Sequence, residues 1–199
     1  MGNELLEIIL KAWTEDTVTY AGKYWQLDEA LPFPKPYQTP HPPVWYAAHS
    51  TTSLDYAARQ NFHVSQNLDV DEVIAEKFDL YRKVWKQCGH DGPMLQTFLM
   101  RPVHVAETDE KARAEAEPRI LEADSLGSRG IAQTRIGFRG NTDTATRSDL
   151  ARGSSEQRNS YDWRIENGLA IVGSPEAVRR KLEKTWGHSD TTYSAPIIK

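Results

Sequence analysis

Apolar residues along the chain change their spacing from strand-like to helix-like several times. Residues 44–48 form a continuous apolar run, which predicts a strand covered on both faces, as in a parallel sheet. A helix to about residue 60 should follow. From Asp71 onward the spacing predicts a long amphipathic helix with Gly89 just beyond its end; its apolar positions are Ile74, Phe78, Tyr81, Trp85 and Cys88. Strands that alternate with helices favour an α/β fold with a mainly parallel sheet.

The N-terminal part predicts a helix, a hairpin and a loop. Asn3 can cap a short helix, and residues 17–27 form two β-prone runs around Gly22. Six of the 11 prolines lie between Pro32 and Pro43, so this segment is expected to be extended loop. The apolar face of the helix consists of Leu5, Ile8, Ile9, Ala12 and Trp13.

Further strands are predicted at residues 62–66 and 97–106. The second should lead to a helix capped by Thr108, which Pro118 is expected to kink or shorten. In the segment GLAIVGSPEAVRRKLE, an apolar strand precedes a helix with Ser174 as its N-cap.

Residues 125–166 lack hydrophobic periodicity and are rich in Gly, Ser, Thr and Arg. So long a stretch in a compact domain is usually a functional lid or a disordered insertion, and it is predicted to be a mobile insertion loop. The length of 199 residues fits a single domain, residues 1–199.

Composition narrows the classes of partner and compartment. The net charge of −4 and the pI near 5.9 give no basic field for nucleic acid or anionic lipid. The one cysteine fits a reducing compartment, and no segment has the pattern of a secretory signal or a membrane span. A cytoplasmic protein without nucleic-acid or membrane partners is expected.

Several well-known catalytic patterns are missing. The chain has no G-x-G-x-x-G, no P-loop, no H-E-x-x-H and no Cys-x-x-Cys. The histidines are not paired at ligand spacing, so no metal site is predicted; they are His41, His49, His63, His90, His104 and His188.

The best candidate site is the segment His49-Ser50-Thr51-Thr52-Ser53, at the junction of a predicted strand and a predicted helix. Ligands of α/β sheets lie beyond the carboxyl ends of strands, and a helix N-terminus there offers N–H groups to an anion. The alternative is that Ser50 or Thr52 only caps the helix; Thr52 with Asp55 fits a capping box. Capping accounts for one hydroxyl, whereas four are present.

Three segments carry a resemblance to a known family. They are LLEIILKAWTEDTVTYAGKYWQLDEALPFPKPYQTPHPPVWYAAHSTTSLDYAA, HVAETDEKARAEAE and GSPEAVRRKLE. Together they resemble the flavin-dependent luciferase-like monooxygenases, which include bacterial luciferases, alkanesulfonate monooxygenases and deazaflavin-dependent reductases. The resemblance touches nearly the whole chain apart from the aperiodic stretch.

The resemblance implies a TIM barrel that binds reduced FMN, or a deazaflavin coenzyme, at its C-terminal face. His49, Ser50 and Ser53 fall on the luciferase-type phosphate contacts, His49 through its backbone. In such an enzyme a flavin reductase supplies reduced flavin, which reacts with O₂ to oxidise a small organic substrate. The resemblance leaves the catalytic residues of this chain unknown.

The chain is shorter than the roughly 250 residues of a TIM barrel. It resembles strands five to eight, a partial barrel that begins at the helix before strand five. One reading is a flavin-dependent monooxygenase or a fragment of one. The alternative is a non-catalytic flavin-binding or assembly module that has lost the catalytic half. Open strand edges favour a homo-oligomer, or pairing with a separate first half.

Arg101 and His104 lie on a predicted strand that resembles one lining the family's active site. Alternation should turn Val103 and Val105 toward the outer helices and His104 inward. A structural role for His104 is the simpler expectation.

Overall fold

The computed structural model describes residues 2–67, 69–90, 96–137 and 153–187. The chain divides into two compact units, Met1–Val44 and Trp45–Lys199, where the length predicts a single domain. The proline-rich segment 32–43 lies at the end of the first unit and has no helix or strand, as expected. Because prolines there cannot donate ladder hydrogen bonds, no strand joins the two units across this segment.

The first unit consists of a helix and a hairpin. Helix α1, Gly2–Thr14, begins one residue before the expected cap, so Asn3 lies inside it. Strands β1, Val18–Ala21, and β2, Gln26–Ala30, pair antiparallel as predicted. The Glu4 carboxylate accepts hydrogen bonds from the backbone N–H groups of Lys23 (3.3 Å) and Tyr24 (3.0 Å), which ties α1 to the hairpin turn.

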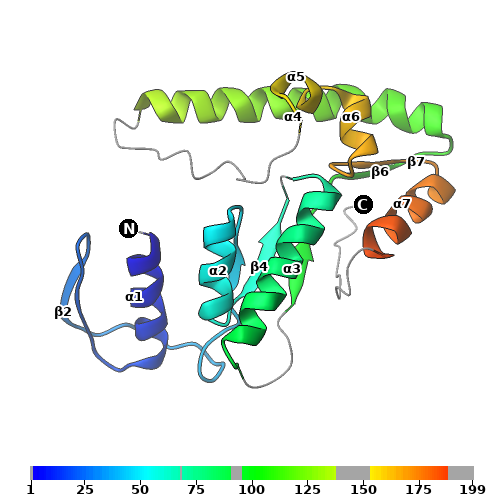
Figure 1. The fold of residues 1–199 in the computed structure, drawn as a ribbon. Helices are drawn as coiled ribbons and strands as arrows, with labels where there is room; N and C mark the ends of the chain where they lie inside the picture. Colours follow the sequence, from blue (N-terminus) through cyan, green and yellow to red (C-terminus); the bar gives the residue numbers. More distant parts are fainter. Residues whose placement is uncertain (1, 68, 91–95, 138–152, 188–199) are drawn as a thin grey trace. The chain divides into compact units, whose positions relative to one another are not determined.

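The second unit contains a three-stranded parallel sheet of β3, Trp45–Ala47, β4, His63–Gln66, and β5, Thr97–Leu99, in the order β3-β4-β5. Helix α2, Thr51–Arg59, joins β3 to β4, and α3, Asp71–Gln87, follows β4 (Figure 1). Both helices and both parallel pairings confirm the elements that the sequence pattern predicted. The buried apolar residues of α2, β4 and α3 include Leu54, Ala57, Ala58, Val64, Val73, Ile74, Phe78 and Tyr81.

The predicted strand 97–106 is two short strands in different sheets. After β5 the chain leaves the first sheet, and β6, Val103–Val105, pairs in parallel with β7, Ile171–Gly173. The break has a physical cause: Pro102 has no N–H for a ladder, and the Arg101 guanidinium binds the backbone oxygens of Asn67 (2.9 Å) and Asp69 (2.5 Å). One continuous strand is therefore a wrong prediction.

Three helices lie within or extend into the stretch that was expected to be irregular. Helix α4, Asp109–Gly137, runs through Pro118, and α5, Ser155–Arg158, and α6, Tyr161–Glu166, follow (Figure 1). The sequence of α4 has no helical repeat of apolar residues along its length, so periodicity could not reveal its second half. The middle of the predicted insertion loop, residues 138–152, lies outside the described residues.

Helix α7, Pro175–Gly187, ends the described part and starts where predicted, with the Ser174 hydroxyl 3.4 Å from the Ala177 backbone nitrogen. A small core of Ala112, Ala116, Ala170 and Val172 joins α4 to β7. The molecule is thus an α/β protein, and within the described residues no sheet closes into a barrel.

Candidate anion site at the start of helix α2

The β3–α2 junction is held by a reciprocal capping box. Ser50 is the N-cap, in an extended conformation with φ −106° and ψ 160°, and its hydroxyl accepts the Ser53 N–H at 3.2 Å. The Ser53 hydroxyl in turn accepts the Ser50 N–H at 3.0 Å and donates to the Ser50 carbonyl at 2.8 Å. The alternative that Ser50 caps the helix is confirmed, and capping uses two of the four hydroxyls rather than one. The expected box of Thr52 with Asp55 is wrong, because Thr52 lies inside the helix and Asp55 forms an ion pair with Arg59 at 2.7 Å.

Helix α2 differs from its neighbours in the charge of its first turn. It has no acidic residue there, whereas α3 has Asp71 and Glu72, and α4 and α7 also begin with carboxylates. Carboxylates in a first turn neutralise the positive end of the helix dipole. At α2 only uncharged hydroxyls lie at this positive end, so no side-chain charge in the first turn neutralises it.

His49 lies directly before the cap and is half-buried. Its backbone carbonyl accepts a hydrogen bond from the Lys77 ammonium, while its ring Nδ1 is buried without a partner among the described residues. Burial lowers the pKa of the His49 ring, and the nearby Lys77 lowers it further, although Asp69 acts in the opposite direction. The ring is therefore neutral near pH 7, and its unpartnered nitrogen can serve a ligand.

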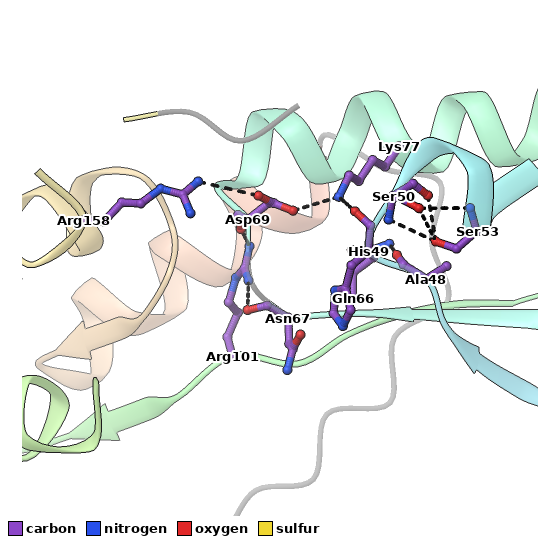
Figure 2. Close-up of polar contacts among 10 residues, drawn as sticks. All are labelled: Ala48, His49, Ser50, Ser53, Gln66, Asn67, Asp69, Lys77, Arg101 and Arg158. Atoms are coloured by element: carbon purple, nitrogen blue, oxygen red, sulfur yellow. Dashed lines mark hydrogen bonds and ion pairs between the residues drawn. The ribbon is translucent and has the colours of Figure 1, made fainter. Parts of the chain in front are cut away.

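Buried charges lie behind the junction (Figure 2). Lys77 is fully buried, and its Nζ is 2.8 Å from Asp69 Oδ2. Asp69, also buried, has Arg158 Nη2 at 3.7 Å from its other oxygen, and Arg101 reaches the Asp71 carboxylate at 3.0 Å. These contacts join α3, α5 and the end of β5 at the carboxyl end of β4.

A cavity of about 160 Å³ lies at the carboxyl ends of the three parallel strands. The Gln66 amide donates to the Ala48 carbonyl, but its buried Oε1, like Asn67 Oδ1, has no partner in the part of the chain that the structure describes. The residues that line the cavity are Ala47, His49, Ser65, Gln66, Asn67, Phe98 and Met100. Unpartnered buried oxygens are costly, so a cavity bordered by two of them suits a polar ligand.

A larger cavity of about 510 Å³ is a poorer candidate for an anion. It lies among α3, α6 and α7, and its lining carries one lysine, Lys184, against five carboxylates: Asp71, Glu72, Glu76, Asp79 and Glu166. Such a surface repels phosphate. The smaller cavity beside α2 has no carboxylate in its lining, so it does not repel an anion in this way.

Of the other singled-out residues, His104 is placed differently from the prediction. Its Nε2 is 2.8 Å from Glu115 Oε2 of α4, whereas Val103 and Val105 are 51% and 48% exposed. The valines therefore do not face the helices, because α4 packs on the other side of β6 and takes the His104 side chain. Arg101 supports the loop after β4. Neither residue lines the cavity beside α2.

Three polar residues near this junction, Lys77, Gln66 and Asn67, were not predicted from the sequence. Lys77 was not predicted to be buried because lysine is charged, although it lies on the apolar face of α3 between Ile74 and Phe78. A lysine at a position whose spacing predicts burial was the available signal. Gln66 and Asn67 follow a strand directly, which marks the binding edge of a parallel sheet.

No group of three or more His, Cys, Asp or Glu side chains among the described residues is placed to hold a metal ion. No helix among them is both long and apolar enough to cross a membrane.

The chain is similar to known proteins of one family. Residues 1–188 match the family described as luciferase-like monooxygenases. The FMNH2-dependent dimethylsulfone monooxygenase of Pseudomonas putida is 21% identical over 180 residues, which is 90% of this chain and 48% of that protein. The oxygenase component of the flavin-dependent trigonelline monooxygenase of Acinetobacter baylyi is 26% identical over 114 residues, or 57% and 31% of the two chains.

The chain spans half or less of the length of these curated relatives. A similar fold occurs in the crystal structure of monooxygenase RslO1 from Streptomyces bottropensis, with a TM-score of 0.69 and 22% identity; the match covers 98% of this chain and 53% of that one. The family match covers both compact units and the β3–α2 junction. The chain therefore belongs to the luciferase-like monooxygenase family.

Proposed function

We propose that this chain is the flavin-binding part of a flavin-dependent monooxygenase and that FMN binds with its phosphate at the start of α2. The observation that carries this proposal is the combination at one junction of an acid-free helix N-terminus and a cavity bordered by unpartnered polar atoms. Helix N-termini bind phosphate through backbone N–H groups and the dipole.

Three residues would hold the phosphate. The Ser50 hydroxyl, which donates to Ser53 Oγ at 3.1 Å, and the Ser53 hydroxyl, which donates to the Ser50 carbonyl at 2.8 Å, can turn their protons to phosphate oxygens. His49 would contribute through its backbone, as the family resemblance implies. The unpartnered oxygens of Gln66 and Asn67 would accept hydrogen bonds from donor groups of the cofactor.

The family match supports a flavin over other phosphate ligands, and the names of the relatives support FMN. A deazaflavin coenzyme, which the resemblance also allows, would carry its phosphate to the same place. Reduced flavin reacts with O₂ and supplies the oxidising chemistry, so the proposed partners are a flavin reductase and a small organic substrate. The proposed architecture is part of a TIM barrel in which both compact units form one luciferase-like domain.

A second function, a non-catalytic flavin-binding module, is favoured by the placement of the titratable groups. Around the cavity beside α2, the lining supplies binding groups and one neutral histidine. His104, the other histidine considered for chemistry, is bound to Glu115. Oxidation of a substrate by O₂ in the presence of a flavin reductase would separate the two functions, because a binding module gives none.

Titration with FMN and with riboflavin tests the binding site. Replacing both Ser50 and Ser53 with alanine should weaken FMN by about 2 kcal/mol, about 30-fold, from the loss of two hydrogen bonds to a charged group. Riboflavin, which lacks the phosphate, should bind wild type and variant alike.

The matched control is Ser174→Ala, which removes the N-cap hydroxyl of α7. Both variants lose capping, which costs about 1 kcal/mol of stability per cap, but the control should keep its FMN affinity. Equal FMN affinities in the wild type and the double variant would refute the phosphate site.

A further inference from the structure

The fully buried lysine of α3 is an unexpected feature of the core. Lys77 is 0% exposed and Asp69 is 1% exposed, and Lys77 lies between the buried residues Ile74 and Phe78 on one face of the helix. Removing two charges from water costs several kcal/mol per ion, so apolar residues of similar size often give equal or greater stability. A functional role explains the burial of this pair better than a contribution to folding stability does.

The contacts of the ammonium group point to that role. Lys77 Nζ donates to Asp69 Oδ2 at 2.8 Å and also to the backbone carbonyl of His49 (Figure 2). His49 directly precedes the N-cap Ser50, so the hydrogen bond fixes the peptide that leads into α2. The hydrogen bond spans 28 residues of sequence and links the middle of α3 to the β3–α2 junction.

We propose that Lys77, held in place by Asp69, is the positioning residue of the α2 anion site. Its bond to the His49 carbonyl holds the junction so that the backbone N–H groups and the Ser50 and Ser53 hydroxyls face one point. This inference rests on the proposed phosphate site and adds a residue that does not touch the ligand.

Asp69 completes the arrangement by orienting Lys77. One carboxylate oxygen binds the ammonium, and the other is 3.7 Å from Arg158 of α5. The Asp69 backbone carbonyl is fixed by Arg101 at 2.5 Å. Asp69 is therefore held from two sides and keeps Lys77 directed toward His49.

The test replaces the pair by uncharged residues of similar shape. Lys77→Met combined with Asp69→Asn leaves neither charge of this pair buried alone. The double variant should bind FMN at least about tenfold more weakly, because the lost hydrogen bond to the His49 carbonyl loosens the junction, with riboflavin affinity unchanged. A change confined to the phosphorylated ligand distinguishes positioning of the anion site from a general structural role. Lys83→Met, on the exposed face of the same helix, is the matched control and should bind FMN like the wild type.

Lys77→Arg is the second variant, because it keeps the charge beside Asp69 but presents it in a planar group. It should weaken FMN by about threefold or more, again without affecting riboflavin, because the guanidinium cannot repeat the ammonium geometry. Wild-type FMN affinity in whichever of the two variants unfolds cooperatively would overturn the inference.

The outcomes also separate this inference from the proposed function. If the Ser50 and Ser53 double variant loses FMN affinity and the Lys77 variants do not, only the role of Lys77 fails. If the wild type binds neither FMN nor inorganic phosphate, the proposed site fails and the role of Lys77 with it.

Discussion

The junctions β3–α2 and β7–α7 have the same design but differ in charge. In each, a parallel strand leads to a serine that caps the next helix. At α7 the Ser174 N–H donates to the carboxylate of Asp109, the first residue of α4, at 2.6 Å, and Glu176 is an acid in the first turn of α7 itself. At α2 the Ser50 N–H donates to the Ser53 hydroxyl, and no acid is present.

This difference shows that a serine cap after a strand does not by itself indicate an anion site. At α7 the protein supplies its own anion, and the Ser174 backbone N–H and hydroxyl hold the pKa of Asp109 below its usual value. At α2 the donors are satisfied without charge, so the positive end of the helix remains available. The acid in the first turn, rather than the cap, distinguishes the two junctions.

The largest effect is expected when α2 is made to resemble α7. Thr52→Glu places a carboxylate in the exposed first turn of α2. It should weaken FMN by about 2–3 kcal/mol through charge repulsion near the phosphate, yet stabilise the helix by about 0.5 kcal/mol. FMN titration and thermal unfolding measure the two opposite changes. Gln60→Glu, at the other end of α2, is the control for added charge, and similar FMN loss in both variants would contradict the comparison.

A smaller effect is expected when Asp109 of α4, which binds the Ser174 N–H at the start of α7, is neutralised. Asp109→Asn should lower stability at neutral pH and leave FMN affinity unchanged. The native pKa of Asp109 is lowered from 3.8, so its stabilisation is present above that pH and is lost as the pH falls through the native pKa. Thermal unfolding of both proteins at several pH values should show their difference shrink in acid. A difference that is constant with pH would exclude a contribution from the charge.

The smallest effect concerns the pH dependence at the α2 junction. The native pKa of His49 lies below 6.5, so its contribution to stability is present above pH 6.5 and is lost as the pH falls through the native pKa. In urea unfolding, the His49→Gln variant should therefore lose less of its free energy of unfolding on acidification than the wild type does. His63, whose pKa burial also lowers, provides the comparison, since His63→Gln should retain the His49 step. An unchanged pH profile in His49→Gln would show that the ring is not the titrating group.

Periodicity was a reliable guide where an element buries one face. The spacing from Ile74 to Trp85 predicted α3, because burial selects apolar residues there. The apolar run before His49 predicted β3, but the expectation that this strand is covered on both faces is wrong, since Trp45 is 45% exposed. Periodicity failed in the second half of α4, whose sequence has no helical repeat of apolar residues. It also failed at residues 100–102, where the side-chain contacts of Arg101 and the missing N–H of Pro102 end a strand.

The candidate site was predictable in part. The hydroxyl-rich segment identified the junction, and the structure brings His49, Ser50 and Ser53 together there, although their binding of phosphate remains a prediction. The sequence could not pair Lys77 with His49, because that contact depends on how α3 packs across 28 residues of chain. Local patterns identify caps, whereas tertiary packing decides which buried charge supports them.

The reciprocal hydroxyl pair of α2 also has an entropic consequence. The first turn of the helix is already formed in the free protein, with Ser50 and Ser53 each binding the backbone of the other. At this junction an arriving phosphate therefore needs only two hydroxyl protons to rotate. Preorganisation of this kind spares the conformational entropy that flexible sites lose on association, so more of the interaction energy is kept as affinity.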